Sequence, residues 1–94
     1  ISPLGLGVKA NREALFEGRS GVDYIKSFIP EDDFPVKIAG EVKGFDPKNY
    51  IDHKDIKKMD RFIHYAIACT KMAMDESGFE INDSNAERVG VLLA

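Results

Sequence analysis

Hydrophobic positions recur at helical spacing in two parts of the chain, which predicts two helices. The first covers residues 8–19, and Gly18 or Gly21 is expected to end it. The second covers residues 59–77, where apolar side chains occupy most of the circumference. Because an isolated surface helix would not carry so much apolar surface, we expect this long helix to be packed on most sides.

The residues after the long helix predict a stop and then a strand. Gly78 is expected just past the helix, with Phe79 folding back onto the last turn as in a Schellman motif. A polar connector, residues 82–87, leads into residues 89–94, an apolar run typical of a strand buried on both faces of a sheet. Since the chain offers few other strands, we expect a piece of a larger domain; a small α+β domain with an apolar tail is the alternative.

The stretch between the two helices predicts a weak strand and a helical turn. Residues 20–35 contain two prolines and an acidic run, so we expect an irregular loop. Residues 34–42 alternate between apolar and polar and predict a short strand. Pro47 is well placed to begin a one-turn helix after Asp46.

Composition narrows the class of protein. With 44% hydrophobic and 31% charged residues, the 94-residue chain is typical of one small globular domain and not of a disordered or fibrous protein. No apolar stretch is long enough to span a membrane, and no signal-peptide pattern is present. A net charge of −3 argues against nucleic acid as a partner. The single cysteine excludes an internal disulfide framework and fits a cytoplasmic location.

That cysteine lies in a segment, Ala68-Cys69-Thr70, that resembles a nucleophile tripeptide, with His64 nearby. A nucleophilic cysteine needs an exposed, electropositive position with a base in reach. The helical phase instead places Cys69 on the apolar face and His64 on the polar stripe, about 500° of rotation away. We therefore expect Cys69 to be an inert core residue and His64 a surface residue. No metal site is expected, since His53 and His64 lack ligand spacing.

Basic side chains gather before and at the start of the long helix. Asp52 is a plausible N-cap for a short basic helix over residues 53–58. Residues 43–61 contain six basic and four acidic side chains, a local charge of +2. Four of the cations follow the spacing i, i+3, i+4 and i+7, so a continuous helix would carry them on one side; they are Lys54, Lys57, Lys58 and Arg61, here called the basic cluster. Such segregated charge can steer an anionic partner, and a merely solvated helix face is the alternative.

The same residues carry a resemblance to a known family. Lys57-Lys58-Met59-Asp60-Arg61-Phe62, followed by Tyr65-Ala66, resembles the Arg/Lys-Met-Asp-x-Phe-x-x-Tyr-Ala segment of elongating β-ketoacyl-[acyl carrier protein] synthases of type II. Four further segments resemble that family in the same order: residues 1–5, 13–21, 38–47 and 87–91. The resemblance covers nearly the whole chain.

The resemblance implies an α/β fold that is part of the thiolase fold, with its αβαβα layers. Residues 1–94 would be the N-terminal portion of the synthase N-terminal domain, contributing the first helix, a capping region, the long helix and a buried strand. This incomplete domain would be mostly helices and loops with one or two strands. The family forms homodimers, and no cofactor or metal is expected.

The resemblance also implies a function for the intact protein. It would be a fatty-acid elongation acyltransferase that joins an acyl group to malonyl-[acyl carrier protein] with loss of carbon dioxide. The catalytic cysteine and two histidines would lie in later parts of such a protein, so we expect no catalytic residue here. Cys69 is followed by Lys71-Met72 where the family nucleophile is followed by Ser-Gly or Thr-Gly.

One role transfers by position. The family's basic residues before Met-Asp dock the acidic acyl carrier protein, and they match Lys54, Lys57 and Lys58. Arg61 joins them on spacing alone. Two other functions remain open: a condensing domain of the polyketide-synthase type, and a small autonomous binding module that holds an acidic partner on its basic helix.

Overall fold

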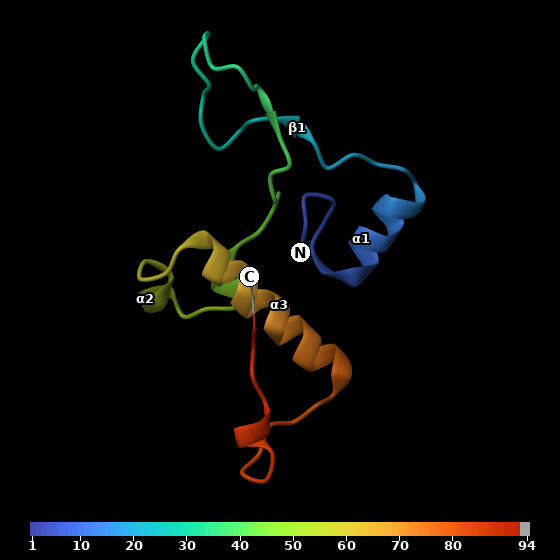
Figure 1. Cartoon of the computed structure of the whole chain (residues 1–94), viewed down its shortest axis with the longest axis vertical. Helices are drawn as coiled ribbons and strands as arrows, with labels where there is room; N and C mark the ends of the chain where they lie inside the picture. The colour runs from blue at the N-terminus through green and yellow to red at the C-terminus, as the bar shows by residue number, and fades with distance from the viewer. Residues whose placement is uncertain (93–94) are drawn as a thin grey trace. The chain divides into compact units, whose positions relative to one another are not determined.

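The computed structural model describes residues 1–92 and divides the chain into two compact units (Figure 1). The first unit, Ile1–Phe45, contains helix α1 and the strands β1 and β2. The second, Asp46–Ala94, contains the short 3₁₀ turns η1 and η2 and the helices α2 and α3. The candidate functional residues lie in the second unit.

Helix α1, Gly7–Phe16, is held at its start by a side chain. Asn11 Nδ2 donates hydrogen bonds to the carbonyl oxygens of Gly5 at 2.8 Å and Gly7 at 2.7 Å. The Ser2 hydroxyl in turn donates to Asn11 Oδ1. Gly5 is required here because a Cβ at that position would lie 2.7 Å from the Cβ of Ala10.

The end of α1 confirms Gly18, rather than Gly21, as the terminating glycine. Gly18 has a φ of +64°, in the left-handed region. Its N–H donates to Leu15 O at 3.1 Å, and the N–H of Arg19 donates to Ala14 O at 2.9 Å. These two bonds are the 5→2 and 6→1 pair of a Schellman motif. The predicted helix over residues 8–19 is therefore correct in place and about one turn too long at its end.

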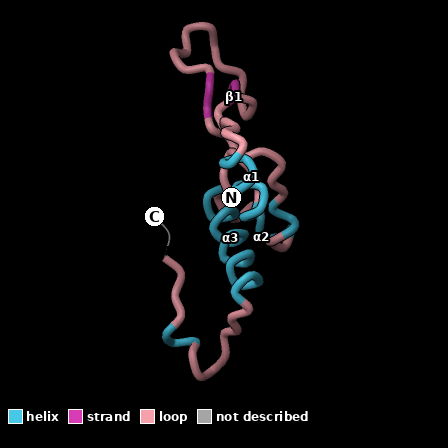
Figure 2. Tube along the Cα trace, turned by 90° about the vertical axis from the view of Figure 1, so that its right-hand side faces the viewer, coloured by secondary structure: helices cyan, strands magenta, loops and turns pink. Residues whose placement is uncertain are grey.

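Strands β1, Asp23–Tyr24, and β2, Ile38–Ala39, form an antiparallel pair in which Asp23 is opposite Ala39 (Figure 2). The predicted strand over residues 34–42 is confirmed only for β2. The prediction of a wholly irregular loop over residues 20–35 is wrong at β1. β1 has no sequence pattern that predicts it, because its two residues form a strand only by pairing with β2, which is distant in the sequence.

The second unit begins as predicted. η1, Pro47–Asn49, has Asp46 as its N-cap, and Asp46 Oδ1 accepts a hydrogen bond from Lys48 N at 3.0 Å. Helix α2, His53–Ile56, follows Asp52, which occupies the N-cap position without making a side-chain cap bond. α2 and α3 both pack against η1.

Helix α3, Arg61–Ser77, confirms the long helix but not its predicted burial. Only His64 and Ala68 are buried on it, and Phe62 is 69% exposed. The expectation that α3 is packed on most sides is wrong for this chain, because η1 covers only part of its surface and α2 meets it through the His64–Ile56 hydrogen bond.

The end of α3 differs in detail from the prediction. Gly78 has the expected left-handed φ of +63°, and its N–H donates to Met74 O at 3.1 Å. Phe79 N donates instead to Ser77 Oγ, so the motif is the simpler αL cap and not the predicted Schellman motif.

The apolar run after the polar connector does not form the predicted strand. η2, Ala86–Arg88, is followed by Val89 in extended backbone and by residues 90–92 without regular secondary structure. Residues 93–94 of the prediction lie outside the described residues. A strand needs a neighbour for its N–H and C=O groups, and the described part of the chain supplies none at this segment.

Candidate functional site

The basic cluster does not lie on one continuous helix, so the spacing argument for a shared helix face is wrong. Lys54 lies within α2, Lys57 is its C-cap, and Arg61 is the first residue of α3. The α2–α3 break, defined here as residues 57–60, separates the two helices. Asp60 at its end has the extended backbone of an N-cap, with φ −72° and ψ 159°. The four cations are therefore divided between α2, the break and the start of α3.

All four side chains of the basic cluster are nevertheless exposed. Lys58 forms an ion pair, with its Nζ 2.8 Å from Asp55 Oδ1. Within residues 1–92 no ion pair is found for Lys54, Lys57 or Arg61. Three cations thus face solvent without an internal counter-ion, which is the arrangement that an acidic partner can use.

The prediction that His64 lies on the surface is wrong. The side chain is buried, with 8% exposure. Its Nε2 lies 3.0 Å from Ile56 O, and Nε2 carries the proton because a carbonyl oxygen only accepts. In a continuous helix Ile56 O would accept from the backbone four residues later. Here Ile56 O accepts from the imidazole of His64 and from the backbone N–H of Met59 at 3.4 Å, so the last turn of α2 covers a position that the helical phase assigns to solvent.

A groove runs beside the basic cluster, with a volume of about 530 Å³. Ile51, Met59 and Ile67 supply apolar lining, together with Tyr50. Asp52, Asp55 and Lys58 add charged groups. Both members of the Asp55–Lys58 ion pair therefore line the groove, and Lys58 also belongs to the basic cluster.

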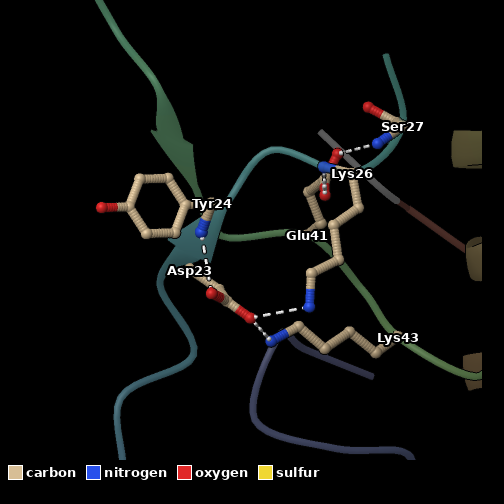
Figure 3. A network of polar contacts seen from close by, with 6 residues as sticks. All are labelled: Asp23, Tyr24, Lys26, Ser27, Glu41 and Lys43. Carbon is tan, nitrogen blue, oxygen red and sulfur yellow. Dashed lines mark hydrogen bonds and ion pairs between the residues drawn. The ribbon is translucent and has the colours of Figure 1, made fainter. Parts of the chain in front are cut away.

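A separate polar network in the first unit centres on Asp23 (Figure 3). Asp23 Oδ2 lies 3.0 Å from Lys43 Nζ and 3.1 Å from Lys26 Nζ, and Asp23 Oδ1 accepts from Tyr24 N. Glu41 accepts from the backbone N–H of Lys26 at 2.8 Å. The network ties the segment after β2 to the segment around β1, and we interpret it as structural.

The charge of Asp23 makes this network sensitive to acid. The Lys43 ammonium, then Lys26 and the Tyr24 N–H, hold the pKa of Asp23 well below its ordinary value of 3.8. A carboxylate with a lowered folded-state pKa contributes stability above pH 3.8, and that contribution is lost as the pH falls below 3.8 toward the folded-state pKa.

We expect Asp23 to remain ionised at pH 3.8 in the folded full-length protein. An NMR titration of carboxyl-labelled aspartate measures this directly, with Asp23→Asn to assign the resonance. The same variant should flatten the loss of thermal stability on acidification below pH 3.8, since its side chain does not titrate. A titration midpoint for Asp23 at or above 3.8 contradicts the prediction.

Cys69 lies in the middle of α3, as predicted, but it is only half-buried. The imidazole of His64, the base nearest to it in the sequence, is hydrogen-bonded to Ile56 O. No group of three or more metal-ligating side chains occurs in residues 1–92. In the same described part of the chain, no helix has the length and apolar character needed to cross a bilayer.

Two of these features were not anticipated from the sequence. The Asp55–Lys58 pair has the i, i+3 spacing of opposite charges, which was available as a signal. The Asp23 network joins residues 20 positions apart, and no local pattern indicates it.

Comparison with known proteins gives a consistent result. The family model described as the β-ketoacyl synthase N-terminal domain matches residues 1–94. The chain is 43% identical over 93 residues to 3-oxoacyl-[acyl-carrier-protein] synthase 2 of Vibrio cholerae, covering 99% of this chain and 22% of that protein. It is 45% identical over 93 residues to the protein of the same name from Vibrio harveyi, with the same coverage of 99% and 22%. The Staphylococcus aureus protein is 38% identical over 91 residues, 97% of this chain and 22% of that protein. The chain therefore spans about a fifth of the length of these relatives.

Proposed function

The chain belongs to the β-ketoacyl synthase family, and from this we propose that the intact protein is a fatty-acid condensing enzyme of the 3-oxoacyl-[acyl-carrier-protein] synthase 2 type. The supporting observation is that the family model matches all 94 residues. The similarity to the two Vibrio proteins, both named 3-oxoacyl-[acyl-carrier-protein] synthase 2, extends over 93 residues. On this proposal the thiolase fold is completed by residues beyond the 94.

The proposed reaction proceeds in two transfers. The acyl group first moves from its carrier to an enzyme cysteine, as one thioester replaces another. Malonyl-[acyl carrier protein] then loses carbon dioxide, and the electron pair left on its carbon attacks the acyl thioester. The cysteine leaves as a thiolate, and the product is a 3-oxoacyl thioester on the carrier. We place the cysteine and the two assisting histidines outside these 94 residues.

We assign two contributions to the chain itself. One is scaffold, from α1, α3 and the segments around them. The other is a docking surface for the acidic acyl carrier protein, formed by the basic cluster at Lys54, Lys57, Lys58 and Arg61. The exposure of all four cations supports this assignment, because exposed charges raise the association rate and orient the partner more than they raise affinity.

The activity itself is tested with the full-length protein. Incubation with acyl-[acyl carrier protein] and malonyl-[acyl carrier protein] is expected to release carbon dioxide and to give a product longer by a two-carbon unit. The 94-residue chain alone serves as a negative control and should release none. If the full-length protein yields neither carbon dioxide nor an elongated product, the proposed function is wrong.

The same proposal extends to the state of the enzyme in the cell. We propose that it acts as a homodimer in the cytoplasm. A mass measurement on the full-length protein in solution tests the dimer. The sequence of the full-length protein separates this function from a polyketide-type condensing domain: a missing catalytic cysteine, or a fusion to acyltransferase modules, would favour the latter.

A further inference from the structure

Lys58 differs from the other cations of the basic cluster because it already has a counter-ion. Its Nζ lies 2.8 Å from Asp55 Oδ1, within hydrogen-bond distance. The Asp55 side chain is 38% exposed, whereas that of Lys58 is 68% exposed. The carboxylate is thus the better-shielded member of the pair, and the ammonium is the member that a partner can reach.

The backbone fixes this pairing. Asp55 N donates to Asp52 O at 2.9 Å, and Lys58 N donates to Asp55 O at 3.0 Å. The turn that closes α2 therefore places the carboxylate beside the ammonium three residues later. Forming the pair restricts few rotatable bonds on the Asp55 side, because that side chain is short and both the N–H and the C=O of Asp55 are already hydrogen-bonded.

We propose that Asp55 tunes the affinity for the acyl carrier protein by competing with the partner's carboxylates for Lys58, an inference that rests on the proposed function. An acidic partner gains Lys58 only by displacing Asp55. The exchange of one ion pair for another adds little to affinity, so the net contribution of Lys58 is smaller than that of Lys54 or Lys57. A carrier that must deliver its cargo and leave in every cycle benefits from such a weakened contact, because dissociation is faster.

The test uses the full-length enzyme and a fluorescently labelled acyl carrier protein, with Kd measured by anisotropy at low salt. Asp55→Asn keeps the shape of the side chain and frees Lys58. We expect it to lower Kd by about two- to fivefold, the range that corresponds to an exposed ion pair. At high salt the difference should disappear, because exposed charges are then screened.

Asp52→Asn is the matched control. Asp52 lines the same groove and carries the same charge, but it forms no ion pair within residues 1–92. We expect a clearly smaller decrease in Kd than for Asp55→Asn. In a Lys58→Gln background, Asp55→Asn should have no more effect than Asp52→Asn, since the cation for which Asp55 competes is then absent.

The outcomes separate the two proposals. An unchanged or raised Kd for Asp55→Asn overturns the tuning role, and so does an equal effect of Asp52→Asn. The docking assignment fails independently if the charge reversal of Lys57 and Lys58 leaves carrier-protein binding intact. A failure of Asp55→Asn alongside a strong effect of that reversal refutes only the inference about Asp55.

Discussion

Replacing Lys57 and Lys58 together by glutamate is expected to raise the KM for the acyl carrier protein about tenfold at low salt in the full-length enzyme. Each exposed ion pair contributes about 0.2–1 kcal/mol, and charge reversal adds repulsion to the lost attraction. The reversal should also remove much of the salt dependence of KM, because fewer favourable charge contacts remain to be screened. Steady-state rates at two ionic strengths measure both effects.

The control for this change is Lys9→Glu with Lys71→Glu. Both side chains are exposed and lie outside the basic cluster, and the double change alters net charge by the same amount. We expect KM for the carrier protein to stay within about twofold of the unmodified enzyme, since these charges lie outside the proposed contact. If Lys57→Glu with Lys58→Glu leaves KM at low salt unchanged, the docking surface is wrongly assigned.

The second large effect is expected from His64→Ala, which should lower the free energy of unfolding by about 2–3 kcal/mol. The variant removes the hydrogen bond to Ile56 O and empties a buried position. Amide hydrogen exchange across the α2–α3 break should accelerate, because this hydrogen bond holds the end of α2 against α3. Calorimetry and exchange mass spectrometry of the full-length protein measure the two consequences.

His64→Gln and Lys71→Ala are the comparison variants. Gln retains a side-chain N–H donor of similar reach, so we expect it to recover much of the loss. Lys71 is exposed on the same helix, and its truncation should change stability by less than about 0.5 kcal/mol. A His64→Ala protein as stable as Lys71→Ala would show that the buried hydrogen bond has no structural weight.

The features that were predicted correctly depend on local chemistry. Pro47 after a capping Asp46, and the glycines Gly18 and Gly78 after their helices, act within a few residues of the chain. The long helix followed from apolar spacing and was placed to within two residues. In each case the responsible contact lies inside the same turn or the next one.

The features that were missed depend on contacts between residues in different helices or strands. His64 was predicted to face solvent because the pattern of α3 alone carries no information about the carbonyl of Ile56, to which the imidazole is hydrogen-bonded. β1 exists only because β2 pairs with it. The strand expected over residues 89–94 is not formed in its described part, because an apolar pattern does not supply a neighbouring strand.

The candidate site shows the same division. The four basic residues were identified from the sequence, and all of them are exposed. Their arrangement was not predicted, because one continuous helix was assumed where α2 ends and α3 begins. The turn at the end of α2 pairs Lys58 with Asp55. Lys58 therefore has a counter-ion, which Lys54 and Lys57 lack within residues 1–92.

The α2–α3 break has a thermodynamic consequence for binding. Backbone hydrogen bonds at its start and the buried imidazole of His64 hold this segment before any partner arrives. The entropy of ordering its backbone is therefore lost during folding and not during association, which leaves only side-chain freedom to be lost on binding. A surface of this kind is preorganised, and substitutions beneath it, at residues that no partner touches, should alter recognition as surely as substitutions on it.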